Sequence, residues 1–100
     1  MKVIEVNESN FQNEIAAGKV LVDFNATWCG PCRMLKPILE EFSEVATIKV
    51  CSIDTDQNEN LARNYNIYSI PCLILFENGK EVKRNVGLLS LDELKEFVGE

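Results

Sequence analysis

The spacing of hydrophobic residues changes along this chain, and each spacing predicts an element of secondary structure. Short runs rich in β-branched and aromatic residues indicate strands at residues 3–6, 20–24, 48–53, 72–76 and 81–86. Apolar residues three or four positions apart indicate helices at about residues 9–17, 30–44, 59–65 and 90–98. The order βαβαβαββα predicts an α/β fold, in which a mixed sheet has helices on both faces.

Two short motifs predict where helices begin. Ser9 is followed three residues later by Gln12, and Ser90 by Glu93. Both pairs have the spacing of a capping box, in which each side chain accepts from the other residue's backbone N–H. Gly18 is expected to end the first of these two helices.

The helix over residues 30–44 has an inward face formed by Met34, Leu35, Ile38, Leu39 and Phe42. The pattern continues past Pro37, so this proline is expected to kink the helix and not to end it. Further along, Asn78-Gly79 separates two strands, and this dipeptide is a strong hairpin signal. The last two strands are therefore expected to pair antiparallel.

Two cysteines lie where the strand over residues 20–24 ends and the helix over residues 30–44 begins. Cys29 and Cys32 have the i, i+3 spacing that places side chains on one helix face, with Cβ atoms roughly 5–6 Å apart. Bridged cysteines need Cα atoms about 4.4–6.8 Å apart, so this pair is expected to open and close a disulfide reversibly. Half of a zinc site is the alternative, but the chain has neither a second CxxC nor any histidine.

The position of each cysteine predicts a different role. Cys29 is expected at the helix N-terminus, where free N–H groups and the helix dipole favour a thiolate, and therefore as the nucleophile. Cys32 lies one turn further on, is expected to be less exposed, and suits the resolving role. Between them, Pro31 fits the first helical turn and Gly30 leaves space for another chain to approach the sulfur.

Composition and charge narrow the function further. The 100 residues, 46% of them hydrophobic and 26% charged, fit one globular domain over residues 1–100. A net charge of −6 argues against nucleic acid or an anionic membrane as a partner, and the lack of histidine excludes Ser–His and Cys–His hydrolase machinery. With no apolar run near the length of a membrane span and no start typical of a signal peptide, a cytoplasmic location is expected.

The segment Trp28-Cys29-Gly30-Pro31-Cys32 resembles the active-site signature of the thioredoxin family, and the likeness runs the length of the chain. The other residues that match the family pattern are Val22-Asp23-Phe24, Pro37, Ile70-Pro71, Asn78-Gly79 and Val86-Gly87. The resemblance implies the thioredoxin fold, a five-stranded sheet flanked by four helices with the strand over residues 20–24 near the middle.

The resemblance also implies a surface that meets a partner. Pro71 stands where the family has a cis-proline, and a cis bond would turn the Ile70 backbone toward the active site. An extended target segment could pair with it there as a short added strand. The residues expected to line a shallow apolar groove around Cys29 are Trp28, Gly30, Pro31, Ser69, Ile70, Val86 and Gly87.

Asp23 is an acidic residue inside the apolar run over residues 20–24, and cover on both faces of that run predicts its burial. Burial raises the pKa of a carboxyl and lets it exchange protons near neutral pH. By resemblance to the family, Asp23 is expected to accept the proton of Cys32. Asn25 and Ser52 depart from the family pattern, which often has Trp and Lys there, and without that lysine Asp23 is expected to be harder to ionise.

Two further cysteines lie outside the pair. Cys51 is expected to be inert core of its strand. Cys72 follows Pro71 where the family usually has Thr, and two interpretations stay open. It is a small residue that fills the threonine space, or a third thiol near Cys29 that forms an alternative disulfide or completes a metal site.

These features predict a general protein-disulfide reductase that needs no cofactor or metal. Cys29 attacks a target disulfide, Cys32 resolves the mixed disulfide, and a separate thioredoxin reductase restores the dithiol, since the chain has no GxGxxG motif. The expected partners are disulfide-containing proteins and that reductase, and the protein is expected to be a monomer. The alternatives are a disulfide oxidase or isomerase on the same fold, a redox-independent binding module, and a metal or iron–sulfur carrier that uses Cys29, Cys32 and Cys72.

Overall fold

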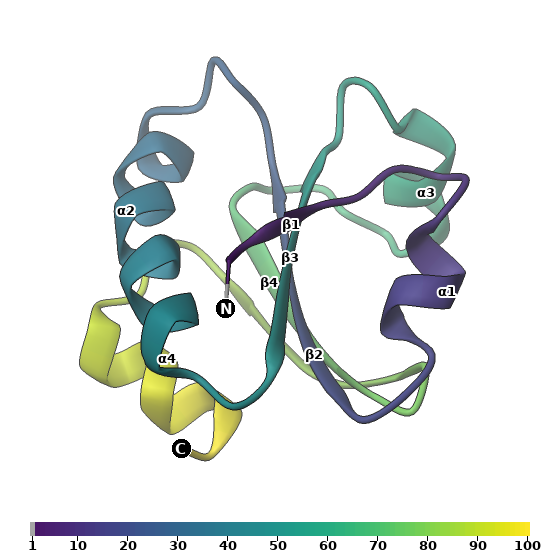
Figure 1. Ribbon diagram of the computed structural model, residues 1–100. Helices are drawn as coiled ribbons and strands as arrows, with labels where there is room; N and C mark the ends of the chain where they lie inside the picture. The colour runs from purple at the N-terminus through teal and green to yellow at the C-terminus, as the bar shows by residue number, and fades with distance from the viewer. Residues whose placement is uncertain (1) are drawn as a thin grey trace.

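The computed structural model describes residues 2–100, in which a sheet lies between two pairs of helices (Figure 1). The elements follow the predicted order: β1 (Ile4–Glu5), α1 (Phe11–Ile15), β2 (Lys19–Asn25), α2 (Gly30–Val45), β3 (Lys49–Asp54), α3 (Glu59–Asn64), β4 (Cys72–Glu77), β5 (Lys80–Val86) and α4 (Leu91–Val98). The α/β class inferred from the spacing of apolar residues is therefore confirmed.

The five strands lie in the order β1-β3-β2-β4-β5, so β2 is central, as the family resemblance implied. β3 runs parallel to both β1 and β2, whereas β4 is antiparallel to β2 and β5. The hairpin between β4 and β5 is confirmed. Asn78 and Gly79 both have positive φ, +52° and +85°, as a tight turn between twisted strands requires.

Helices α2 and α4 cover one face of the sheet, and α1 and α3 cover the other (Figure 1). Successive side chains of a strand point to opposite faces, so the run Val20–Phe24 is divided between two cores. Val22 and Phe24 pack with α1 and α3, and Leu21 packs with α2 and α4. Because both faces are covered, every residue from 20 to 24 is buried, Asp23 included.

The predicted start of the first helix is wrong. The helix begins at Phe11 and ends at Ile15, with Asn10 at its N-cap, so Ser9 and Gln12 form no capping box. The Asn7 carboxamide oxygen accepts instead from the backbone N–H and the hydroxyl of Ser9, at 2.9 and 2.6 Å. Ser9 is therefore part of a turn closed by the Asn7 side chain, and its hydroxyl is not available to cap the helix.

The second capping box is confirmed at the start of α4. The Ser90 hydroxyl accepts from the Glu93 N–H at 3.2 Å, and the Glu93 carboxylate accepts from the Ser90 N–H at 2.9 Å. Each interaction satisfies a backbone donor that the helix itself leaves free. The start of α4 was therefore predictable from the local sequence.

Helix α2 continues through Pro37 to Val45, as its apolar pattern predicted. Leu35, Leu39 and Phe42 are buried, but Met34 is 60% exposed, so its assignment to the inward face is wrong. Met34 lies about 100° around the helix from Leu35, at the edge of the apolar stripe. The sheet and α4 cover the centre of the stripe and leave this edge open.

Candidate active site at the start of helix α2

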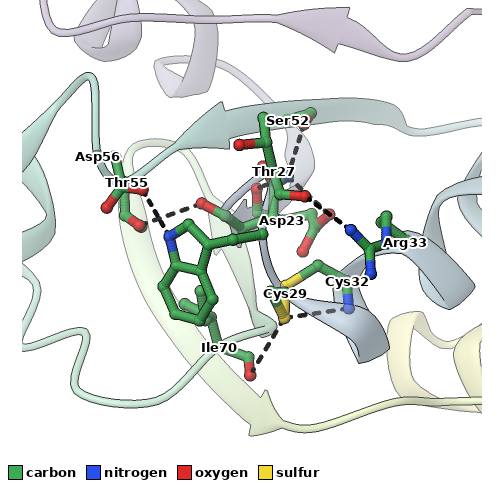
Figure 2. Close-up of a disulfide and its surroundings, with 11 residues drawn as sticks. Asp23, Thr27, Cys29, Cys32, Arg33, Ser52, Thr55, Asp56 and Ile70 are labelled. Carbon is green, nitrogen blue, oxygen red and sulfur yellow. Dashed lines mark hydrogen bonds between the residues drawn. A yellow bond between two sulfur atoms is a disulfide. The ribbon is translucent and has the colours of Figure 1, made fainter.

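The paired cysteines lie in the turn that connects β2 to α2. Cys29 is the N-cap of α2, and its Sγ accepts a hydrogen bond from the backbone N–H of Cys32 at 3.2 Å. Cys29 and Cys32 form a disulfide with their Cα atoms 5.2 Å apart, as their spacing predicted (Figure 2). The helix N-terminus therefore points an N–H group at the sulfur expected to be the nucleophile.

The two cysteines are almost equally covered in this oxidised form, at 5% and 4% exposed, so Cys32 is less exposed than Cys29 by a very small margin. Ala26 and Ile70 pack around both side chains. What differs is the surroundings of each cysteine. Cys29 Sγ lies 3.9 Å from the carbonyl oxygen of Ile70, whereas Cys32 lines a cleft that also contains Asp23 (Figure 2).

Asp23 projects from the middle strand toward α2 and is only 3% exposed, which confirms the predicted burial. Desolvation by burial raises the pKa of its carboxyl from 3.8 to about 6; a hydrogen bond from Asn25 lowers it, and the charge of Glu5 raises it. The Oδ1 atom is buried with no hydrogen-bond partner among the described residues. The carboxyl is therefore placed to change protonation near neutral pH.

A cleft of about 920 Å³ lies between α2 and the β1 side of the sheet. Its walls include Val3, Glu5, Asp23, Asn25, Cys32, Lys36, Leu39 and Ser52. Because the buried Asp23 and the resolving Cys32 share this space, a proton has room to pass between them directly or through water.

Sequence analysis missed a hydrogen-bond network at the end of β2. The Asn25 amide donates to Asp23 Oδ2 at 3.0 Å and to Ser52 Oγ at 2.8 Å. One sequence signal could have indicated the bond to Asp23: Asn25 is two residues after Asp23 and so shares its face of the strand. The bond to Ser52 depends on the register of β2 and β3, which pairs Ser52 with Asp23.

The predicted groove residues surround Cys29 from two further loops. The Ile70–Pro71 peptide bond is cis, as the resemblance implied. Gly87 donates its N–H to the Pro71 carbonyl at 2.8 Å and adopts φ +110°, a conformation that favours glycine. This interaction holds the end of β5 against the loop before β4.

The surface beside Cys29 is open and partly apolar. Trp28 and Val86 are 66% and 58% exposed, Ser69 is exposed, and Ile70 is half-buried. A Cβ added at Gly30 would meet nothing within 4 Å, so the space over it is empty. The Trp28 indole N–H donates to Asp56 at 2.7 Å, a contact that local sequence did not indicate.

Neither remaining cysteine lies in this arrangement. Cys72 is buried in the core on the α1 and α3 side of the sheet, and burial raises its pKa. Cys51 belongs to the same core, where burial raises its pKa to about 11, as expected of an inert residue. Among residues 2–100 no three His, Cys, Asp or Glu side chains are placed to hold a metal ion, so a metal site completed by Cys72 finds no support.

The Cys29–Cys32 pair can bridge at the start of a helix, with Cα atoms at an ordinary disulfide spacing. This arrangement is typical of proteins that carry out thiol–disulfide exchange. The sequence model of thioredoxin matches residues 2–100. The chain is 46% identical to thioredoxin of Chlamydia trachomatis over 94 residues, which cover 93% of this chain and 92% of that protein. It is 40% identical to thioredoxin of Staphylococcus saprophyticus over 100 residues, 98% of this chain and 96% of that protein.

The same likeness holds in three dimensions. A solved structure of a mutant thioredoxin from Halobacterium salinarum superposes with a TM-score of 0.92 at 36% identity, covering 97% of this chain and 88% of that one. The chain therefore belongs to the thioredoxin family. Within the described residues, no helix has the length and apolar character needed to cross a membrane.

Proposed function

We propose that this chain is a general protein-disulfide reductase that passes two electrons from the Cys29–Cys32 dithiol to disulfides of other proteins. The observation that supports it best is the place of Cys29 at the N-cap of α2, one turn from a cysteine that can bridge to it. The protein works in the cytoplasm, where a separate thioredoxin reductase returns the pair to the dithiol.

The first step is attack by Cys29 on a target disulfide. The positive end of α2 and the Cys32 N–H favour the Cys29 thiolate, which is the reactive form. Its sulfur forms a mixed disulfide with one target sulfur as the target S–S bond breaks. The second target sulfur leaves as a thiolate and takes a proton from solvent.

The second step releases the target. Asp23 accepts the Cys32 proton, and the Cys32 thiolate attacks Cys29 Sγ, which forms the Cys29–Cys32 disulfide and breaks the bond between Cys29 and the target. The departing target thiolate is then protonated. The support for Asp23 in this role is its burial, its pKa of about 6 and the cleft that it shares with Cys32.

The target binds in the groove around Cys29. An extended segment pairs with the Ile70 backbone beside cis-Pro71, as strands are added in other peptide complexes. The residues that contact it are Trp28, Ser69, Ile70, Val86 and Gly87. Gly30 and Pro31 leave the approach to the sulfur open.

The test is reduction of insulin disulfides with dithiothreitol as the electron source. Cys29→Ser should abolish catalysis above the background of dithiothreitol, whereas Cys32→Ser should accumulate a mixed disulfide that mass spectrometry detects. Cys72→Ala is the matched control, because it removes a buried thiol outside the site. Full turnover by Cys29→Ser would show that the dithiol is not the catalyst. A wild type that reduces insulin no faster than dithiothreitol alone would favour a redox-independent binding module.

The direction of electron flow needs a second measurement. The protein is equilibrated in graded dithiothreitol buffers, free thiols are alkylated, and the products are weighed. The reduction potential of the Cys29–Cys32 pair in a reductase should lie well below the roughly −180 mV of protein disulfide isomerase. A potential at or above that value would turn the assignment toward an oxidase or isomerase.

A further inference from the structure

We propose that Asn25 is a positioning residue, which holds the Asp23 carboxyl in its ionised form and so keeps a proton acceptor ready for Cys32. The inference rests on the proposed role of Asp23 and adds the residue that controls it. The hydrogen bonds of the Asn25 amide nitrogen within residues 2–100 go to Asp23 and Ser52 and to neither cysteine, so Asn25 acts through Asp23.

The geometry gives the Asn25 amide a fixed direction. An amide nitrogen has two N–H groups, and here the nitrogen lies 3.0 Å from Asp23 Oδ2 and 2.8 Å from Ser52 Oγ. The same nitrogen also lies 3.2 Å from the Asp23 carbonyl oxygen. Ser52 Oγ and the Asp23 carboxylate thus accept from one amide nitrogen, and the bond to Ser52 helps to hold that donor beside Asp23.

A hydrogen bond donated to a carboxyl stabilises its charged form, as a nearby cation would. Neither of the two ion pairs within residues 2–100 includes Asp23. Asp23 Oδ1 has no hydrogen-bond partner among these residues, so the bond from Asn25 to Oδ2 is what offsets the desolvation of the carboxylate. Burial alone would keep the carboxyl protonated to higher pH.

Other charged and titratable groups face this cleft. They are Lys2 before β1, Glu5 on β1, Cys32, Arg33, Lys36, Glu40 and Glu44 on α2, and Asp54 on β3, with Cys72 of β4 on the opposite face of the sheet. Of these, Glu5 acts most clearly on Asp23, and its negative charge opposes ionisation. The hydrogen bond from Asn25 therefore lowers an Asp23 pKa that burial and the charge of Glu5 both raise.

The consequence is a pH-dependent resolving step. When Asp23 is a carboxylate, it takes the proton from the Cys32 thiol, and the resulting thiolate displaces the target from Cys29. When Asp23 is already protonated, it cannot take this proton. A loss of the Asn25 donor moves the loss of activity on acidification to higher pH.

The experiment compares Asn25→Leu with the wild type by following the ¹³C signal of the Asp23 carboxyl through a pH titration. A hydrogen bond to a charged group is worth enough to shift a pKa by about one unit, so the midpoint should rise from about 6 to about 7. At pH 6 the ionised fraction would then fall from about a half to about a tenth. The rate of target release at that pH should fall about fivefold, with the difference shrinking at pH 8.

Two further variants isolate the pathway. In an Asp23→Asn background, Asn25→Leu should have no further effect on the rate, because its route of action is gone. Ser52→Ala keeps the donor to Asp23 and should shift the midpoint less than Asn25→Leu does. Asn13→Leu, an exposed asparagine on α1, is the matched control for the substitution itself. If Asn25→Leu does not fold, Asn25→Ala serves in its place.

An Asp23 midpoint that stays within a few tenths of a unit in Asn25→Leu would overturn the inference, as would a shift just as large in Ser52→Ala. If the midpoint moves but the rate profile does not, Asn25 still controls the carboxyl, and it is the proton-acceptor role of Asp23 that fails. The two claims are thus separable in one set of measurements.

Discussion

The two faces of strand β2 differ in the side chains that they carry: one face enters an aromatic core and the other lines a cleft with polar groups. Toward α1 and α3, Val22 and Phe24 enter a core in which the rings of Phe11, Phe24, Tyr65 and Phe76 lie 5.5–6.2 Å apart. Toward α2, the next residues along, Asp23 and Asn25, line a cleft with Cys32. One face is lined mainly by aromatic and aliphatic side chains, and the other places polar groups beside a disulfide.

The difference shows how the protein combines stability with chemistry. The aromatic face buries several large apolar side chains, so this burial contributes strongly to the free energy of unfolding. The cleft face buries a carboxyl with an unpartnered oxygen, which costs stability when it is ionised. The packed aromatic face supports the strand from which Asp23 and Asn25 project.

The largest expected effect is on the aromatic face. Phe11 is fully buried and contacts three other rings, so Phe11→Ala should lower the free energy of unfolding by about 3–5 kcal/mol, from lost burial and the cavity left behind. Urea unfolding measures it, and Gln12→Ala, at the exposed neighbouring position, is the control. A loss below about 1 kcal/mol would mean that this face is not the main source of stability.

On the cleft face, removal of the buried Asp23 carboxyl should raise the free energy of unfolding, whereas Phe11→Ala lowers it. The folded protein keeps the Asp23 proton up to about pH 6, whereas the unfolded chain loses it near 3.8, so stability falls as the pH rises through that interval. Asp23→Asn abolishes this loss and should raise the free energy of unfolding by about 3 kcal/mol at pH 8. Below pH 4 the gain should vanish.

Urea unfolding at pH 4, 6 and 8 separates this linkage from a general packing effect. A stabilisation by Asp23→Asn that is the same at all three pH values would contradict a carboxyl with a raised pKa. Thiol exchange should become slower in the same variant, which would show that this face trades stability for reactivity.

The smallest effect is expected at Cys72, which lies close to the site in sequence but on the aromatic face. Cys72→Ala should cost about 1 kcal/mol of stability from lost burial and leave the Cys29–Cys32 equilibrium with dithiothreitol unchanged. Alkylation followed by mass spectrometry checks both states of the pair. A shifted equilibrium, or protection of Cys72 along with the pair, would establish the third thiol as redox-active.

Much of this structure follows from short-range patterns in the sequence. The order of strands and helices, the burial of residues 20–24, the Asn78-Gly79 hairpin and the capping box at Ser90 each depend on residues a few positions apart. The cysteine pair is local in the same sense, because an i, i+3 spacing at a helix start places both sulfurs within reach. Each of these features was therefore predictable from a short stretch of sequence.

Short-range patterns therefore predicted the order of the elements, the dithiol and the burial of the Asp23 carboxyl, though not the start of α1. They did not predict that Asn25 bonds to Ser52, that Trp28 bonds to Asp56, that Cys29 and Cys32 are almost equally covered, or that Cys72 lies on the other face from Asp23. These features were not predictable because they depend on residues of different elements. The pairing of β2 with β3 and β4, together with the helices that cover each face, brings them together.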